Sequence, residues 1–238
     1  MDWAVVVGRT TLSRSTNALI AKAKEVYVID PRAAKVDPKR SATKIFSDVP
    51  TIVGSPESWK IESDFIEIDG WNEPAVAQCI AANLPYGSTL YVSSSRPIRD
   101  LEAFAEPRDG VEVFANRGLA GIDGNLSTAL GIASKRECTY AVVGDLAFLH
   151  DINGLLIGKD EKSANLTIIV ISNDGGGIFS TLPQRDVPGF EKIFGTPHGR
   201  DLVSIAESYG IPAVAVRTLD ALRAQLARQT QGINVIVA

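Results

Sequence analysis

The chain has 238 residues, of which 45% are hydrophobic and 22% are charged, a composition typical of a folded globular protein rather than a disordered one. There are 24 Lys and Arg residues against 28 Asp and Glu residues, and the resulting net charge of −4 argues against nucleic acid as a partner. Binding to phosphates needs an excess of basic side chains on one face. There is no apolar run of about 18 residues that could span a membrane, and the amino terminus lacks the basic segment of a signal peptide.

Two cysteines, Cys79 and Cys138, lie far apart and match no metal-ligand spacing. We therefore expect reduced thiols in a cytoplasmic protein. Both ends of the chain are apolar strand candidates, at residues 4–7 and 233–237, so the chain resembles a piece of a longer protein.

Short β-branched runs alternate along the chain with segments that carry apolar residues at helical spacing. The runs predict strands over residues 4–7, 25–29, 65–68, 89–93, 111–114, 139–143, 166–171, 213–216 and 233–237. The segments between them predict helices over residues 15–24, 73–82, 98–104, 125–135, 151–158, 202–209 and 219–228. Apolar strands separated by helices indicate an α/β fold with a doubly wound parallel sheet covered on both faces.

Turn-forming residues at positions 83–88 predict a joint between two domains. Residues 1–87 hold two strand–helix units and a polar stretch, so they predict a partial, smaller α/β domain. Residues 88–238 alternate regularly enough to form one complete doubly wound domain.

Polar residues follow two consecutive predicted strands. Asp145 comes after the strand at 139–143, and Asn173, which is 28 positions later, comes after the strand at 166–171. Parallel pairing of these strands would place both side chains at the sheet edge where ligands bind. Oxygen atoms of Asp, Asn and a backbone carbonyl suit Mg²⁺, and the glycines at 175–177 would let a phosphate approach. The alternative is a glycine-rich turn in which Asn and Asp are turn formers.

The Gly-Asp pair followed just under thirty residues later by Asn resembles the pattern of thiamine diphosphate enzymes. In that family the two residues hold the Mg²⁺ (or Mn²⁺) that binds the cofactor's diphosphate. Four further motifs occur in order: SSSRPIRD at 93–100, NRGLAGIDG at 116–124, GIFSTLP at 177–183 and FGTPH at 194–198. Together they look like the MenD family, the 2-succinyl-5-enolpyruvyl-6-hydroxy-3-cyclohexene-1-carboxylate synthases of menaquinone biosynthesis, and the resemblance covers essentially the whole chain.

The resemblance implies a transferase that decarboxylates 2-oxoglutarate and adds the four-carbon product to isochorismate. It implies that residues 88–238 form the diphosphate-binding domain, that residues 1–87 form the later part of the middle domain, and that the full-length enzyme is a homo-oligomer, a dimer or tetramer. The family's pyrimidine-binding domain, with its activating glutamate, has no counterpart in this sequence. We therefore expect the chain to be catalytically incomplete by itself.

The resemblance also assigns roles to individual residues. Asp145, Asn173 and the backbone carbonyl of Gly175 would hold the metal. The arginines would bind substrate carboxylates through two parallel hydrogen bonds. The alternatives are ordinary core positions for the apolar residues and solvated surface positions for the arginines. The residues expected at the cofactor are Ile122, Asp145, Asn173, Gly175, Gly176, Ile178, Phe179 and Leu182, and those expected at the substrates are Ser95, Arg99 and Arg117.

Two other functions stay open from the residues: a different thiamine diphosphate enzyme, related to acetolactate synthase, and a non-catalytic anion-binding α/β module. A role for His150 stays open, whereas His198, beside a glycine-rich turn, is expected to be structural. Arg9, Arg14 and Arg32 are candidates for an anionic ligand such as a pathway product, on the basis of their position alone.

Overall fold

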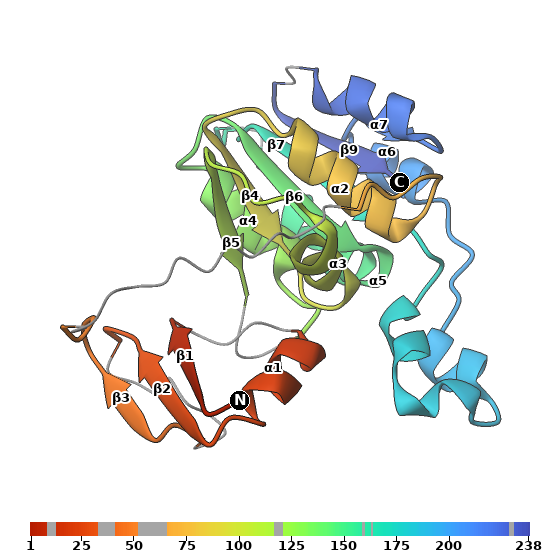
Figure 1. Cartoon of the computed structure of the whole chain (residues 1–238). Coiled ribbons are helices and arrows are strands. Elements are labelled where there is room, and N and C mark those ends of the chain that lie inside the picture. The colour runs from red at the N-terminus through yellow and green to blue at the C-terminus, as the bar shows by residue number, and fades with distance from the viewer. Residues whose placement is uncertain are drawn as a thin grey trace. The chain divides into compact units, whose positions relative to one another are not determined.

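The computed structural model describes residues 1–8, 13–32, 41–51, 66–116, 121–158, 160–162, 164–228 and 231–238. The chain divides into two compact units, Met1–Asp64 and Phe65–Ala238, each with its own parallel sheet (Figure 1). This division precedes the boundary predicted at residue 87. The reason is that helix α2 (Glu73–Asn83) buries Val76, Cys79 and Ile80 in a core of the second unit.

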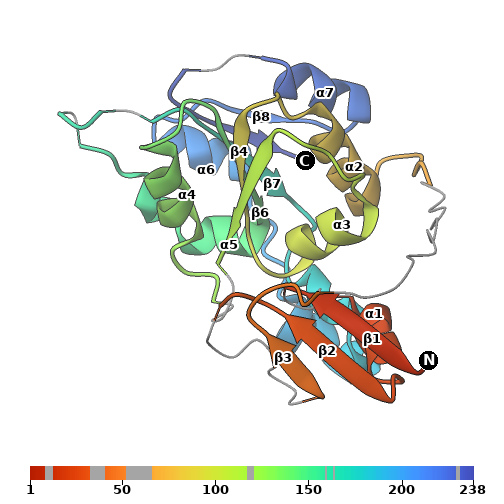
Figure 2. The same ribbon diagram turned by 60° about the vertical axis from the view of Figure 1, so that its left-hand side comes forward.

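The first unit contains β1 (Trp3–Val7), α1 (Arg14–Ile20), β2 (Glu25–Ile29) and β3 (Lys44–Phe46), with the strands in the order β1-β2-β3 (Figure 2). Alternation along the strands places Val6, Val26 and Val28 in a small core, against which Ile20 packs. Strand β3 was not predicted, because its three residues carry only two apolar side chains and follow a polar stretch.

The second unit has a six-stranded parallel sheet in the order β5-β4-β6-β7-β9-β8. Its strands are β4 (Ser88–Val92), β5 (Val111–Ala115), β6 (Thr139–Gly144), β7 (Leu166–Ile171), β8 (Ala213–Ala215) and β9 (Ile233–Val237). From β4 the chain moves outward to β5, and from β6 it moves to β7 in the opposite direction. The point between β4 and β6 is therefore the topological switch of the sheet, where such folds bind ligands.

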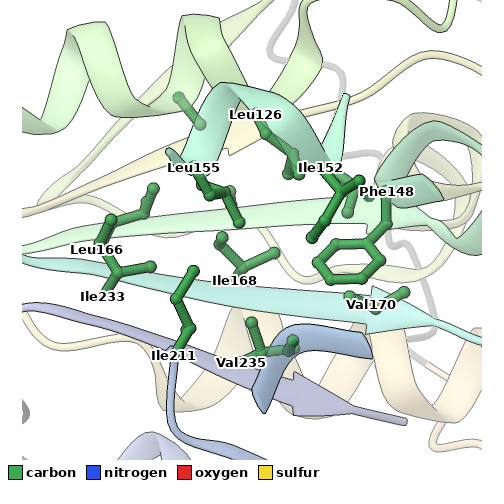
Figure 3. Close-up of a cluster of buried hydrophobic side chains, with 14 of the residues drawn as sticks. Leu126, Phe148, Ile152, Leu155, Leu166, Ile168, Val170, Ile211, Ile233 and Val235 are labelled. Carbon is green, nitrogen blue, oxygen red and sulfur yellow. The ribbon is translucent and has the colours of Figure 1, made fainter. Parts of the chain in front are cut away.

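Helices pack on both faces of this sheet. One core cluster contains residues of α4 (Asn125–Ala133), α5 (Asp145–His150) and α6 (Leu202–Ser208), and part of it is shown in Figure 3. The other contains residues of α2 and α7 (Leu219–Leu226), with α3 (Arg96–Phe104) packed against it. Strand β7 serves both clusters, because Ile168 and Val170 face the first while Ile169 and Ile171 face the second. The predicted α/β doubly wound fold is confirmed.

Several predicted elements differ from the structure around the loops. Residues 66–69 form no strand, and residue 65 lies outside the described residues. Helix α5 begins directly after β6, and the helix predicted at 151–158 is a short 3₁₀ turn, Ile152–Leu155. The loop after β7 carries three further short turns: the 3₁₀ turns Gly177–Thr181 and Pro183–Asp186, and the π turn Glu191–Gly195.

The central strand β7 provides a test of the core. Ile168 is fully buried, so Ile168→Ala is expected to lower the free energy of unfolding by about 2–5 kcal/mol through lost burial and a cavity. Ile66 is 72% exposed, and the same change there is expected to stay within about 0.5 kcal/mol. Urea denaturation of both variants measures the difference, and equal small losses would contradict the described core.

Candidate functional site

The candidate site lies where β6 and β7 end. The two strands pair in parallel up to Gly144 and Ile171, so Asp145 and the turn that begins at Ser172 leave the sheet at the same edge. The Asp145 side chain is buried, and its Oδ2 accepts a hydrogen bond of 2.9 Å from the Gly175 backbone N–H. Its Oδ1 accepts one of 2.7 Å from the Leu146 N–H. The predicted placement of the two strand ends side by side is therefore confirmed.

Asn173 is oriented by a residue that the sequence analysis did not single out. Its Nδ2 donates a hydrogen bond of 2.8 Å to Oε1 of Glu73, the first residue of α2. Among the described residues, no group donates a hydrogen bond to the Oδ1 atom of Asn173. The amide oxygen is thus the end of this side chain that is free to bind a further group.

Glu73 in turn belongs to a charged cluster with Arg96 and Asp100 of α3. The Arg96 Nε lies 2.7 Å from Glu73 Oε2 and 3.2 Å from Asp100 Oδ2. Asp100 is 7% exposed, and its burial raises the pKa of the carboxyl to about 6, although Arg96 acts in the opposite direction. The sequence did not indicate the contact between Glu73 and Asn173, because the two residues are 100 positions apart.

The glycines after Asn173 allow another part of the protein to come close. A Cβ atom on Gly175 would lie 2.1 Å from the carbonyl oxygen of Gly195, and one on Gly176 would lie 2.2 Å from that of Phe194. The Gly176 N–H donates a hydrogen bond of 2.6 Å to the Gly195 carbonyl. From the sequence, these glycines are expected to let a phosphate approach. In the structure, the backbone of Phe194 and Gly195 occupies the space that a side chain on Gly175 or Gly176 would need.

His198 contacts the carboxylate of Asp145. Its Nε2 lies 3.2 Å from Asp145 Oδ2, and its Nδ1 accepts a hydrogen bond of 3.0 Å from the Arg200 N–H. Because Nδ1 is an acceptor, we assign the ring proton to Nε2, which then donates to Asp145. The backbone N–H groups of Gly199 and His198 donate to Asp174 Oδ1 and lower the pKa of that carboxyl. These contacts tie the 194–200 segment to both strand ends.

The apolar residues expected at the cofactor lie in the loops beyond β5 and β7. Ile122 is half-buried and packs against the core cluster of Figure 3. Ile178, Phe179 and Leu182 are also half-buried, and the Phe179 ring lies 5.6 Å from that of Phe194. Ile178, Phe179 and Leu182 lie in the loop that follows Asn173, so this loop carries three half-buried apolar side chains.

Two of the three residues expected at the substrates, Ser95 and Arg99, follow β4, on the other side of the switch. Ser95 directly precedes α3 and has φ 79° and ψ −133°, a conformation that is rare for any residue with a side chain. Arg99 is exposed, and its Nη1 donates a hydrogen bond of 2.7 Å to the Ser95 carbonyl. Arg117 lies outside the described residues.

Other residues considered in the sequence analysis have ordinary surroundings. His150 is exposed, with Nδ1 3.8 Å from Asp123 Oδ1. Arg32 is bound through Nε and Nη2 to the carboxylate of Asp30, and Arg14 is exposed at the start of α1. Arg9 lies outside the described residues.

The oxygen atoms at this edge suit a hard cation. One carboxylate, one carboxamide oxygen and a backbone carbonyl form the kind of donor set that Mg²⁺ takes, with water and phosphate completing its shell. The described part of the chain contains no cluster of three or more His, Cys, Asp or Glu side chains arranged to bind a metal. Among the described residues, there is therefore no alternative metal site built from three or more of these side chains.

A depression of about 880 Å³ lies at the other end of the strands, and its lining includes Lys135, Cys138 and Arg228. It adjoins the amino ends of β4, β6 and β7, away from the carboxyl ends where parallel sheets bind ligands. None of the helices in the described residues is both long and apolar enough to cross a membrane.

The comparison with protein families agrees with this geometry. Residues 100–237, more than half of the chain, match the family described as the C-terminal thiamine pyrophosphate-binding domain of thiamine pyrophosphate enzymes. The chain belongs to this family, whose cofactor is also called thiamine diphosphate.

Three relatives by sequence are each named 2-succinyl-5-enolpyruvyl-6-hydroxy-3-cyclohexene-1-carboxylate synthase. The chain is 40% identical to that of Thermobifida fusca over 90% of its own length and 42% of the relative's. It is 38% identical to that of Nocardia farcinica, over 98% of this chain and 46% of the relative. It is 37% identical to that of Corynebacterium glutamicum, over 100% of this chain and 49% of the relative. The chain thus spans less than half the length of these relatives.

Two solved structures show the same fold at low sequence identity. The thiamine diphosphate-dependent 4-hydroxybenzoylformate decarboxylase of Rhodococcus jostii RHA1 matches 100% of this chain and 48% of its own, with a TM-score of 0.61 and 16% identity. The benzoylformate decarboxylase of Polynucleobacter necessarius matches 99% of this chain and 48% of its own, with a TM-score of 0.59 and 20% identity. These likenesses support the thiamine diphosphate-binding fold.

The backbone of Ser95 gives a testable consequence. Glycine adopts positive φ without steric cost, so Ser95→Gly is expected to raise the free energy of unfolding by about 1 kcal/mol. Ser94 has no such conformation, and Ser94→Gly is expected to lower it by about 0.5–1 kcal/mol through chain entropy. Urea denaturation compares the two, and a loss in both variants would argue against strain at Ser95.

Asp100 gives a pH dependence. Its pKa is about 6 in the folded chain and 3.8 ordinarily, so between these values the folded state binds more protons than the unfolded state. Stability is therefore expected to fall as the pH rises from about 4 to 6. In Asp100→Asn this contribution is absent, so the fall should be shallower. Urea midpoints measured across that range test the point, and identical pH profiles would contradict it.

Proposed function

We propose that the chain is the C-terminal part of a 2-succinyl-5-enolpyruvyl-6-hydroxy-3-cyclohexene-1-carboxylate synthase, with its diphosphate-binding domain. The identity of 37–40% over 90–100% of the chain to relatives of that name carries the proposal. In this proposal the full-length enzyme decarboxylates 2-oxoglutarate and transfers the four-carbon unit to isochorismate. The second unit, Phe65–Ala238, would correspond to the diphosphate-binding domain, which was expected from the sequence over residues 88–238, and the first unit, Met1–Asp64, would correspond to the later part of the middle domain, within a homo-oligomer.

The metal would be held at the edge formed by β6 and β7. Asp145 has one carboxylate oxygen bound to the Gly175 N–H and the other to the Leu146 N–H, and these two hydrogen bonds fix the orientation of its carboxylate. Asn173 offers its amide oxygen, since its nitrogen is bound to Glu73. With the Gly175 carbonyl, these atoms would bind Mg²⁺ or Mn²⁺, which in turn would hold the diphosphate.

Thiamine diphosphate would supply the electron sink for decarboxylation. The half-buried side chains of Ile122, Ile178, Phe179 and Leu182 would contact its apolar parts and exclude water from the reacting carbon. Gly176 would contact it through its backbone. In the structure, Phe179 already packs on Phe194, so this apolar surface is held in place by the following segment.

The substrate carboxylates would be bound from the β4 side of the switch. The arginine fork of Arg99 can form two parallel bonds to a carboxylate, and Ser95 offers a hydroxyl at the start of the same helix. The Arg99 guanidinium now donates to the Ser95 carbonyl, which keeps the two residues together. Arg117 would complete this substrate side.

The proposal predicts binding of thiamine diphosphate that depends on Mg²⁺. Calorimetry on the 238-residue chain should show heat only when both are present. Asp145→Asn removes the single carboxylate of the metal site and is expected to weaken this binding at least tenfold. Asp220→Asn, which alters a 91% exposed side chain on α7, is the matched control and should bind as the unaltered chain does.

Two outcomes would contradict the proposal. Binding that does not change when Mg²⁺ is removed would indicate a simple anion site, the alternative of a non-catalytic module. Equal binding by Asp145→Asn and the unaltered chain would place the metal elsewhere.

A further inference from the structure

Glu73 connects helix α2 to the end of strand β7. It is the first residue of α2, directly after Asn72, whose side chain caps the helix by accepting from the Ala75 N–H. Its Oε1 accepts from Asn173 Nδ2 at 2.8 Å, and its Oε2 accepts from Arg96 Nε at 2.7 Å. Each oxygen of this one carboxylate is therefore used, by a different element of the fold.

We propose that Glu73 is a positioning residue for the metal, which holds the Asn173 carboxamide with its oxygen toward the cation. This inference rests on the proposed role of Asn173 as a ligand. A carboxamide has a donor end and an acceptor end, and a carboxylate accepts hydrogen bonds but does not donate them. Rotating the amide by half a turn would place two oxygen atoms against each other, so Glu73 selects the orientation that presents Oδ1.

Glu73 can select the orientation because it is itself held. The side chains of Glu73 and Arg96 are each 24% exposed, and that of Asp100 is 10% exposed. In such a partly dry setting the hydrogen bonds between charged groups are short and strong. Arg96 lies between the carboxylates of Glu73 on α2 and Asp100 on α3, so it fixes Oε2 of Glu73 relative to α3.

The proximity of Gly177 supports the same orientation of the Asn173 side chain, which is otherwise exposed. A Cβ atom on Gly177 would lie 2.3 Å from Asn173 Nδ2 and 3.3 Å from its Oδ1. The amide nitrogen is thus the end packed against both the Gly177 backbone and Glu73. Outer partners of this kind typically change metal affinity by about 10–100-fold when they are removed.

The test measures the affinity of the chain for Mg²⁺ by calorimetry at saturating thiamine diphosphate. Glu73→Ala is expected to weaken Mg²⁺ binding about tenfold or more. Glu73→Gln has the same shape and keeps one acceptor oxygen, so its loss should be smaller and it serves if the alanine variant fails to fold. Glu207→Ala, which removes an exposed carboxylate on α6, is the control and should leave the affinity unchanged.

A second readout, from ¹⁵N nuclear magnetic resonance without metal, follows the side-chain NH₂ signals of Asn173. They should shift in Glu73→Ala and stay in place in Glu207→Ala. Unshifted signals, or shifted signals with unchanged Mg²⁺ affinity, would overturn the role of Glu73. If the unaltered chain itself showed no Mg²⁺-dependent binding, the proposed function would fail instead, so the two failures are distinguishable.

Discussion

The parallel pairing of β6 with β7 is the constraint on which the rest of the site depends. The hydrogen-bonded register, which ends at Gly144 and Ile171, brings an aspartate and an asparagine from separate segments to one edge of the sheet. The pairing is stable because β7 is apolar on both sides, so helices can pack on each face and exclude water. Burial of the strands thus fixes where the polar residues that follow them must lie.

At that edge, polar groups are held by contacts within the second unit. Asp145 is bound by backbone N–H groups and by His198, and Asn173 is bound by Glu73. The 194–200 segment closes over the glycines and contacts the same carboxylate. These contacts hold the side chains at the strand ends in one orientation, and side chains that the protein itself holds lose less conformational entropy when they bind a metal and a diphosphate.

The sequence predicted the parts of the fold that have strong local patterns. Strand β7, with six buried residues, and β2 have the predicted bounds, and the spacing from Asp145 to Asn173 correctly predicted their placement at one edge. Strand β3 was too short and too polar in context to be recognised. The Glu73 contact could not be predicted, because it joins residues 100 positions apart through tertiary packing alone. The glycines were recognised as sites of close approach, but the sequence did not show that a protein segment is what approaches them.

The central claim is that Asp145 and Asn173 bind the same divalent ion. It is tested most directly by the anomalous scattering of Mn²⁺ in crystals of the chain grown with Mn²⁺ and thiamine diphosphate. The account predicts one strong peak within about 2.3 Å of an oxygen atom of each side chain, with the Gly175 carbonyl as a third ligand. A peak bound at another site, with Asp145 still bonded to His198 and Asn173 free of metal, would contradict it.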